Sequence, residues 1–124
     1  MRKLFLLLFA LGTQVAVAHQ FLPTYPKLEP SFIDGISVTK MELFNSRKDV
    51  SYYELGVFDA EWLPVPFATE SDIVEVGYLQ RKDIQIYIRD KDKQRAVYIC
   101  TKSKHIEEKS QITLVSSRIC SKIK

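Results

Sequence analysis

Short runs in which apolar and polar residues alternate recur along this chain, and they constrain its fold more than any other feature. The clearest run is residues 83–90, where Ile84, Ile86 and Ile88 alternate with polar or aromatic side chains. A period of two residues places every second side chain on one face of a β-strand, whereas an amphipathic helix repeats every 3.6 residues. No helical stripe persists over a useful length in residues 19–124. The pattern therefore predicts an all-β fold.

Five further runs are rich in β-forming residues and are separated by polar turns. They span residues 36–44, 50–58, 72–79, 96–101 and 110–120. In the first of them the alternation changes parity between Val38 and Met41, which predicts a bulge or an irregularity at a sheet edge. An earlier segment, residues 25–30, contains Pro26 and Pro30, which confine it to a sheet edge. About seven short strands in about 100 residues are typical of an antiparallel, immunoglobulin-like β-sandwich, and we expect a single domain of this kind.

Residues 1–18 have the composition of a secretory signal peptide. Two positive residues follow the first methionine, residues 4–11 form an apolar run, and Ala18 ends a small-x-small cleavage pattern. The apolar run is far shorter than the ~20 residues that span a bilayer. We therefore predict cleavage after Ala18, a mature domain of residues 19–124 with no membrane span, and a periplasmic or secreted location.

The charge balance argues against a nucleic-acid partner. The formal net charge of +3 falls to about +1 when the two positive residues of the leader are removed. The remaining charges are interspersed, apart from a local basic bias at the C-terminal end. Nucleic-acid binding requires a basic stripe or a recognisable module, and the sequence contains neither. We expect no nucleic-acid partner.

The chain has two cysteines, Cys100 and Cys120. In an oxidising compartment an even number of cysteines is most simply a disulfide; the alternative is two separate buried thiols. If the two residues face each other on antiparallel strands, residues 98 and 122 also form a facing pair. A bond that closes a loop of roughly 20 residues stabilises a fold by about 3 kcal/mol in the chain-entropy description.

No sequence pattern indicates catalysis or a cofactor. The only histidines are His19 and His105, no hydrolase or metalloprotease motif occurs, and the acidic residues are scattered at strand ends and turns. We therefore predict a protein that is not an enzyme. One weaker metal hypothesis remains, because cleavage after Ala18 would let the His19 amine and imidazole chelate Cu(II), with His105 as a second imidazole. The alternative is that His19 is an exposed, frayed first residue.

The two cysteine-containing stretches, "YICTKSK" and "SSRICSKIK", resemble the last two strands of the N-terminal domain of periplasmic pilus chaperones of the chaperone–usher pathway. The similarity is to the subgroup in which a disulfide joins those strands, with a Cys-x-Lys pattern on each. "MELFNSRKDVSYYELGVFD", "PVPF" and "YLQRKDIQIYIRD" resemble the preceding strands of the same domain. The resemblance covers most of residues 24–124, and the order and spacing of the motifs make it moderately specific.

This resemblance implies a protein partner that is bound by β-strand addition. Alternating apolar residues of the last strand, here Ile112 and Leu114, would enter a groove of the partner subunit. Lys122, the second lysine of the Cys-x-Lys pattern, and Lys27 on the first strand would hold the partner's C-terminal carboxylate. Charge-assisted hydrogen bonds of this kind are strong when they are partly desolvated.

Three functions follow as expectations. The first is an exported, non-enzymatic chaperone-like module that binds a pilin-like or other extracytoplasmic assembly subunit. The second is a structural component that uses the same sheet edge permanently in an envelope or surface assembly. The third is a small copper-binding protein that uses His19.

Overall fold

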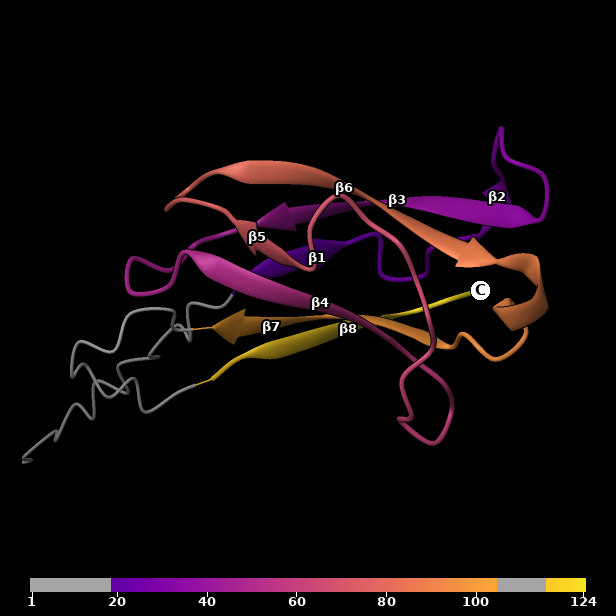
Figure 1. Ribbon diagram of the computed structural model, residues 1–124. Coiled ribbons are helices and arrows are strands. Elements are labelled where there is room, and N and C mark those ends of the chain that lie inside the picture. Colours follow the sequence, from indigo (N-terminus) through magenta and orange to yellow (C-terminus); the bar gives the residue numbers. More distant parts are fainter. Residues whose placement is uncertain (1–18, 105–115) are drawn as a thin grey trace, which may run out of the picture.

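Two antiparallel sheets pack face to face in the computed structural model, which describes residues 19–104 and 116–124 (Figure 1). The predicted all-β sandwich is therefore confirmed. The first sheet contains β1 (Gln20–Leu22), β2 (Glu29–Pro30), β3 (Ile36–Phe44) and β6 (Arg81–Arg89). The second sheet has the strand order β5 (Ile73–Glu75), β4 (Tyr52–Phe58), β7 (Tyr98–Lys104) and β8 (Arg118–Lys122). A short 3-10 helix, η1 (Asp90–Asp92), follows β6.

The long antiparallel pair β3 and β6 forms the centre of the first sheet, with Ile36 facing Arg89 and Phe44 facing Arg81. The bulge predicted within residues 36–44 is wrong, because β3 alternates regularly along its whole length. Its inward positions include the small polar residue Ser37, whereas Val38 lies on the outer face. Ser37 is accommodated because its hydroxyl donates to an Asp90 carboxylate oxygen at 2.6 Å.

The N-terminal segment joins the two sheets. Strands β1 and β2 pair one after the other with the same side of β3, which confirms the edge position predicted for residues 25–30. Between them the chain crosses to β8, where the Lys122 amide donates to Thr24 O at 3.0 Å and the Lys124 amide donates to Pro26 O at 2.9 Å. The outer side of β8 is therefore covered from Lys122 onward.

The core lies between the sheets and consists mainly of the inward-facing residues of β3, β4 and β6. The expected alternation of β4 and β6 is confirmed, because the following six side chains are all buried: Tyr53, Leu55, Val57, Ile84, Ile86 and Ile88. Burying one large apolar side chain contributes about 1.5–3 kcal/mol, so these two strands supply much of the driving force for folding.

Several strands differ in extent from the prediction. Only Ile73–Glu75 of the predicted segment 72–79 forms a strand. The chain turns after it, because the Leu79 amide donates to Asn45 O and the Asn45 amide donates to Gln80 O. Of the predicted segment 110–120, the part up to residue 115 lies outside the described residues, and β8 begins at Arg118. No helix in the described part of the chain is long and apolar enough to cross a membrane.

Candidate functional site

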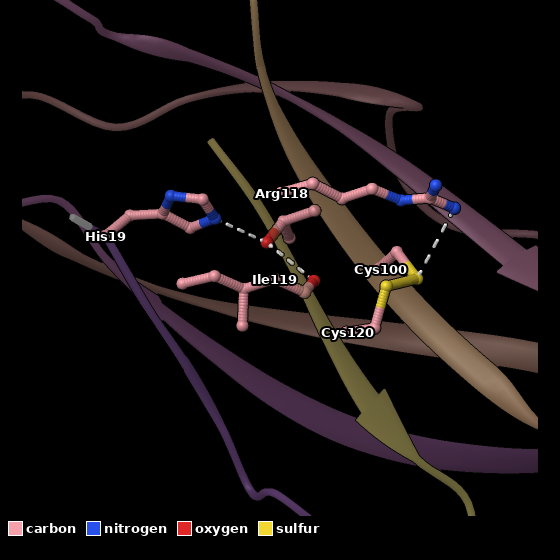
Figure 2. The surroundings of a disulfide bond; sticks show 6 residues. His19, Cys100, Arg118, Ile119 and Cys120 are labelled. Carbon is pink, nitrogen blue, oxygen red and sulfur yellow. Dashed lines mark hydrogen bonds between the residues drawn. A yellow bond between two sulfur atoms is a disulfide. The ribbon is translucent and has the colours of Figure 1, made fainter. Parts of the chain in front are cut away.

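The disulfide fixes the last strand to its neighbour. Cys100 and Cys120 are bonded, and they face each other in the register of β7 and β8 (Figure 2). Tyr98 faces Lys122 in the same register, as the sequence predicts for a facing cysteine pair. Because β8 lies at the end of its sheet, β7 is the strand that it pairs with, and the disulfide links these two strands covalently.

Part of the outer side of β8 has no hydrogen-bonded neighbour strand, although β1 lies nearby. The sheet order ends at β8. The Ser103 amide donates to Ser117 O and the Ile123 amide donates to Val97 O, so the backbone groups of Ser117 and Ile123 point toward β7. Hydrogen-bonding directions alternate along a strand, so the amides and carbonyls of Arg118 and Cys120 point away from β7. This stretch, Arg118–Cys120, is called the open edge below. It lies immediately before the part of β8 that residues 24–26 cover.

The structure brings the two predicted carboxylate-binding lysines onto neighbouring segments. Lys122 is bonded through its amide to Thr24, and Lys27 directly follows Pro26, which is bonded to Lys124. Both side chains are exposed, and neither has an acidic partner within the described residues. Lys122 therefore lies two residues beyond the open edge, and Lys27 follows the segment that pairs with Lys122 and Lys124.

His19 lies inside the protein at the start of β1. Its side chain is 2 % exposed, its Nε2 lies 2.7 Å from Thr101 Oγ1, and its Nδ1 lies 3.1 Å from Ser117 Oγ. Thr101 Oγ1 also donates to Ile119 O, and Ser117 Oγ accepts a bond from Arg47. These bonds fit a neutral ring with its proton on Nε2: Nε2 donates to the Thr101 hydroxyl, and Nδ1 accepts from the Ser117 hydroxyl.

The environment of His19 favours this neutral form. Burial removes water from the ring, and the nearby positive charge of Arg47 repels a second cation; together they lower the pKa of His19 from 6.5 to about 4. Both ring nitrogens already contact hydroxyl groups, so a copper ion on the imidazole would have to displace Thr101 or Ser117. The described residues contain no cluster of three or more metal-binding side chains.

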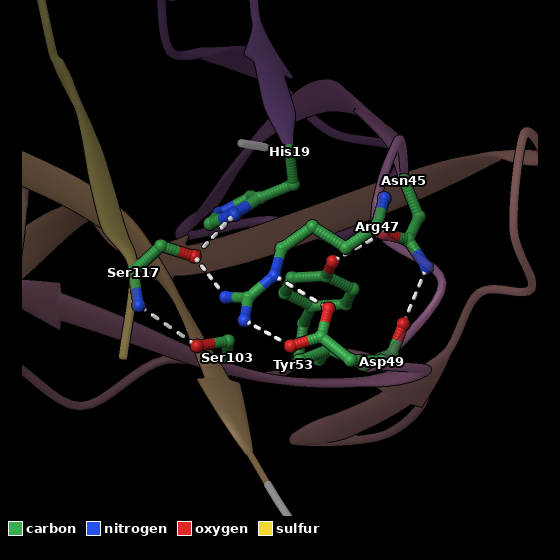
Figure 3. A network of polar contacts seen from close by, with 8 residues as sticks. His19, Asn45, Arg47, Asp49, Tyr53, Ser103 and Ser117 are labelled. Carbon is green, nitrogen blue, oxygen red and sulfur yellow. Dashed lines mark hydrogen bonds and ion pairs between the residues drawn. The ribbon is translucent and has the colours of Figure 1, made fainter. Parts of the chain in front are cut away.

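A buried polar network extends from His19 to the turn between β3 and β4 (Figure 3). Arg47 donates to both carboxylate oxygens of Asp49, at 3.0 and 2.6 Å, and to Ser117 Oγ at 3.3 Å. Asn45 accepts from the Tyr53 hydroxyl at 2.5 Å, and burial raises the pKa of this tyrosine to about 12. The network holds the start of β1, the turn and the start of the β8 segment together.

The sequence did not predict several residues that shape this region. Arg47, Asp49 and Arg118 are not among the site residues that the sequence predicts. The Arg118 guanidinium lies over the rings of Phe58 and Trp62, at 4.7 and 5.0 Å from their centroids. A basic residue two positions before the last cysteine was the available signal. Three predicted site residues, His105, Ile112 and Leu114, lie outside the described residues.

The sequence matches no protein-family model and no curated protein.

Proposed function

We propose that this chain is an exported, non-enzymatic module that binds a protein partner by β-strand addition along β8. The observation that carries the proposal is the open edge: backbone groups of Arg118 and Cys120 point away from the sheet, on a strand fixed by a disulfide. An extended segment that pairs there gains backbone hydrogen bonds without any rearrangement of the sandwich.

The charges beside the edge give this pairing a direction. Lys122 lies two residues beyond the C-terminal end of the open edge, and Lys27 lies beyond it in the same direction, next to the residue that pairs with Lys124. A partner segment whose terminal carboxylate lies between them would run parallel to β8. The carboxylate would replace water around two cations that have no acidic partner in the described part of the chain, and charge-assisted bonds of this type contribute about 1.5–3 kcal/mol.

A proline substitution tests strand addition separately from side-chain contacts. The Arg118 amide points outward, so Arg118→Pro removes a donor from the open edge and leaves the pairing of β7 and β8 intact. Arg118→Ala is the matched control, because it removes the same side chain and keeps the amide. The proteins would be purified from their own cell envelope, and co-purified partners would be measured by quantitative mass spectrometry.

We expect a partner that is retained by the wild type and by Arg118→Ala and is lost from Arg118→Pro. Lys122→Ala should weaken the same contact, whereas Lys40→Ala, which removes a lysine from the other sheet, should not. Equal recovery of the partner with Arg118→Pro would show that β8 does not bind by its backbone. A partner found together with this chain in a finished surface assembly would favour the structural role over a chaperone role.

A further inference from the structure

A shallow site lies on the outer face of the β5-β4-β7-β8 sheet and extends from β4 to the side chains of Arg118 and Cys120 on β8. Here β4, β7 and β8 are in register, so their outward side chains form three rows across the sheet. The first row is charged, the middle row is small and contains the disulfide, and the third row begins with two aromatic rings. In this order the rows are Glu54, Lys102 and Arg118; Gly56, Cys100 and Cys120; and Phe58, Tyr98 and Lys122.

The low middle row leaves a hollow of about 290 Å³ between its neighbours. Gly56 and Cys100 form part of its floor, and rings of Phe58 and Trp62 form one wall. The floor needs a glycine, because a Cβ atom at position 56 would lie 2.7 Å from Cε2 of the Phe58 ring. The volume is near the lower end of ligand pockets, which suits a single ring-sized group.

Two positive side chains face this hollow without an acid between them. Lys102 lies directly opposite Arg118 on the neighbouring strand, and like charges in that arrangement are destabilising. Neither side chain forms an ion pair with a described residue. The hydrogen bond that the Arg118 guanidinium makes within the described chain is a long contact of 3.9 Å to Cys100 Sγ (Figure 2). Its donors are thus available to an oxygen ligand.

The Arg118 guanidinium is nevertheless held in position by aromatic rings. It lies over Phe58 and Trp62, and the Trp62 ring stacks on Tyr98 with centroids 4.2 Å apart and planes at 4°. A guanidinium with a fixed plane is well suited to bind a carboxylate through two parallel hydrogen bonds. The arrangement is therefore preorganised for an anion.

We propose that this hollow binds a sugar that carries a carboxylate. The carboxylate would accept hydrogen bonds from Arg118 and Lys102, and apolar C–H groups of the sugar would contact the Phe58 and Trp62 side chains beside the guanidinium. Glu54, on β4, lines the side of the hollow opposite Arg118. It can accept a hydrogen bond from a sugar hydroxyl while it pairs with Lys104 at 2.8 Å. A sugar acid has hydroxyl groups that can donate to Glu54, whereas an aspartate or glutamate side chain has no such donor, so the row favours a sugar acid.

Titration with trigalacturonic acid, followed by two-dimensional amide NMR, tests this site. Neutral galactotriose and triglutamate serve as matched probes. We expect saturable shifts at Gly56, Lys102 and Arg118 and at the Trp62 indole with trigalacturonic acid, and binding at least tenfold weaker for each of the other two. Loss of a charge-assisted contact of ~1.5–3 kcal/mol corresponds to about tenfold or more in affinity.

Substitutions separate this site from general attraction of anions. Arg118→Gln should weaken binding of trigalacturonic acid about tenfold, whereas Lys40→Gln on the other sheet should leave it unchanged. Lys102→Glu should abolish binding, because it places a second carboxylate beside Glu54 in the row that would hold the ligand's carboxylate. The proposal is overturned if trigalacturonic acid produces no saturable shifts at the hollow, if triglutamate binds equally well, or if Lys40→Gln has the effect of Arg118→Gln.

Discussion

Acidification should destabilise this protein through one residue, His19. In the folded state the pKa of His19 is lowered to about 4, mainly because the ring is buried and secondarily because Arg47 is close. In the unfolded chain the ring returns to the ordinary value of 6.5. Between pH 6.5 and about 4 the unfolded state therefore binds a proton that the folded state does not bind. Stability is greatest above pH 6.5 and falls as the pH decreases through this window.

The size of the effect follows from the shift. Each pKa unit corresponds to ~1.4 kcal/mol, so the shift from 6.5 to about 4 corresponds to roughly 3 kcal/mol of unfolding free energy. The hydrogen bonds of the ring give the reason. In the neutral ring, Nδ1 accepts a hydrogen bond from the Ser117 hydroxyl. A proton on Nδ1 would turn this acceptor into a donor, and it would compete with Arg47, which already donates to the same hydroxyl oxygen.

The measurement is urea unfolding at a series of pH values from 7.5 to 4.0, for the wild type and for His19→Gln. His105→Gln is the matched control, because it removes the other histidine. We expect the wild type and His105→Gln to lose roughly 3 kcal/mol more than His19→Gln over this range. Parallel loss of stability in the wild type and in His19→Gln would refute the assignment of the acid sensitivity to His19.

Three further predictions concern stability. Replacing Cys100 and Cys120 together by serine should lower the unfolding free energy by about 3 kcal/mol, as expected for release of a loop of this length; an unchanged urea midpoint would contradict the role given to the disulfide. Tyr53→Phe should cost about 1–2 kcal/mol, because Asn45 loses a buried hydrogen bond, and a loss no larger than that of an exposed Tyr→Phe change would count against the network. Ile86→Ala should cost about 2–5 kcal/mol by leaving a cavity between the sheets, and calorimetry would show a smaller cost if this side chain were exposed.

Strand positions were largely predictable from the sequence because the two-residue period has a direct structural cause. The predicted run 36–44 coincides with β3, and the alternating isoleucines of β6 all point into the core. The bulge prediction failed because it assumed that apolar residues mark the inner face. In β3 the inward positions include Ser37 and Thr39, and Ser37 is satisfied by Asp90, which is far away in the sequence.

The functional region was predictable only in part. Pairing of Cys100 with Cys120 was predictable from the even number of cysteines, given the oxidising compartment that the sequence predicts. By contrast, His19 was expected at an exposed or metal-binding N-terminus, and the structure places it in a buried network with Thr101 and Ser117. From the sequence alone, a polar residue such as Arg47 is predicted to be exposed to solvent. Its burial depends on tertiary partners that local patterns do not reveal.

Amide hydrogen exchange at β8 tests strand addition most directly. In the free protein the amides of Ile119 and Ser121 should be protected by β7, and that of Lys122 by Thr24, whereas those of Arg118 and Cys120 should exchange fast. In the complex with the co-purified partner, Arg118 and Cys120 should become as protected as their neighbours. Slow exchange of both amides in the free protein, or no change on binding, would contradict an open edge that receives a partner strand.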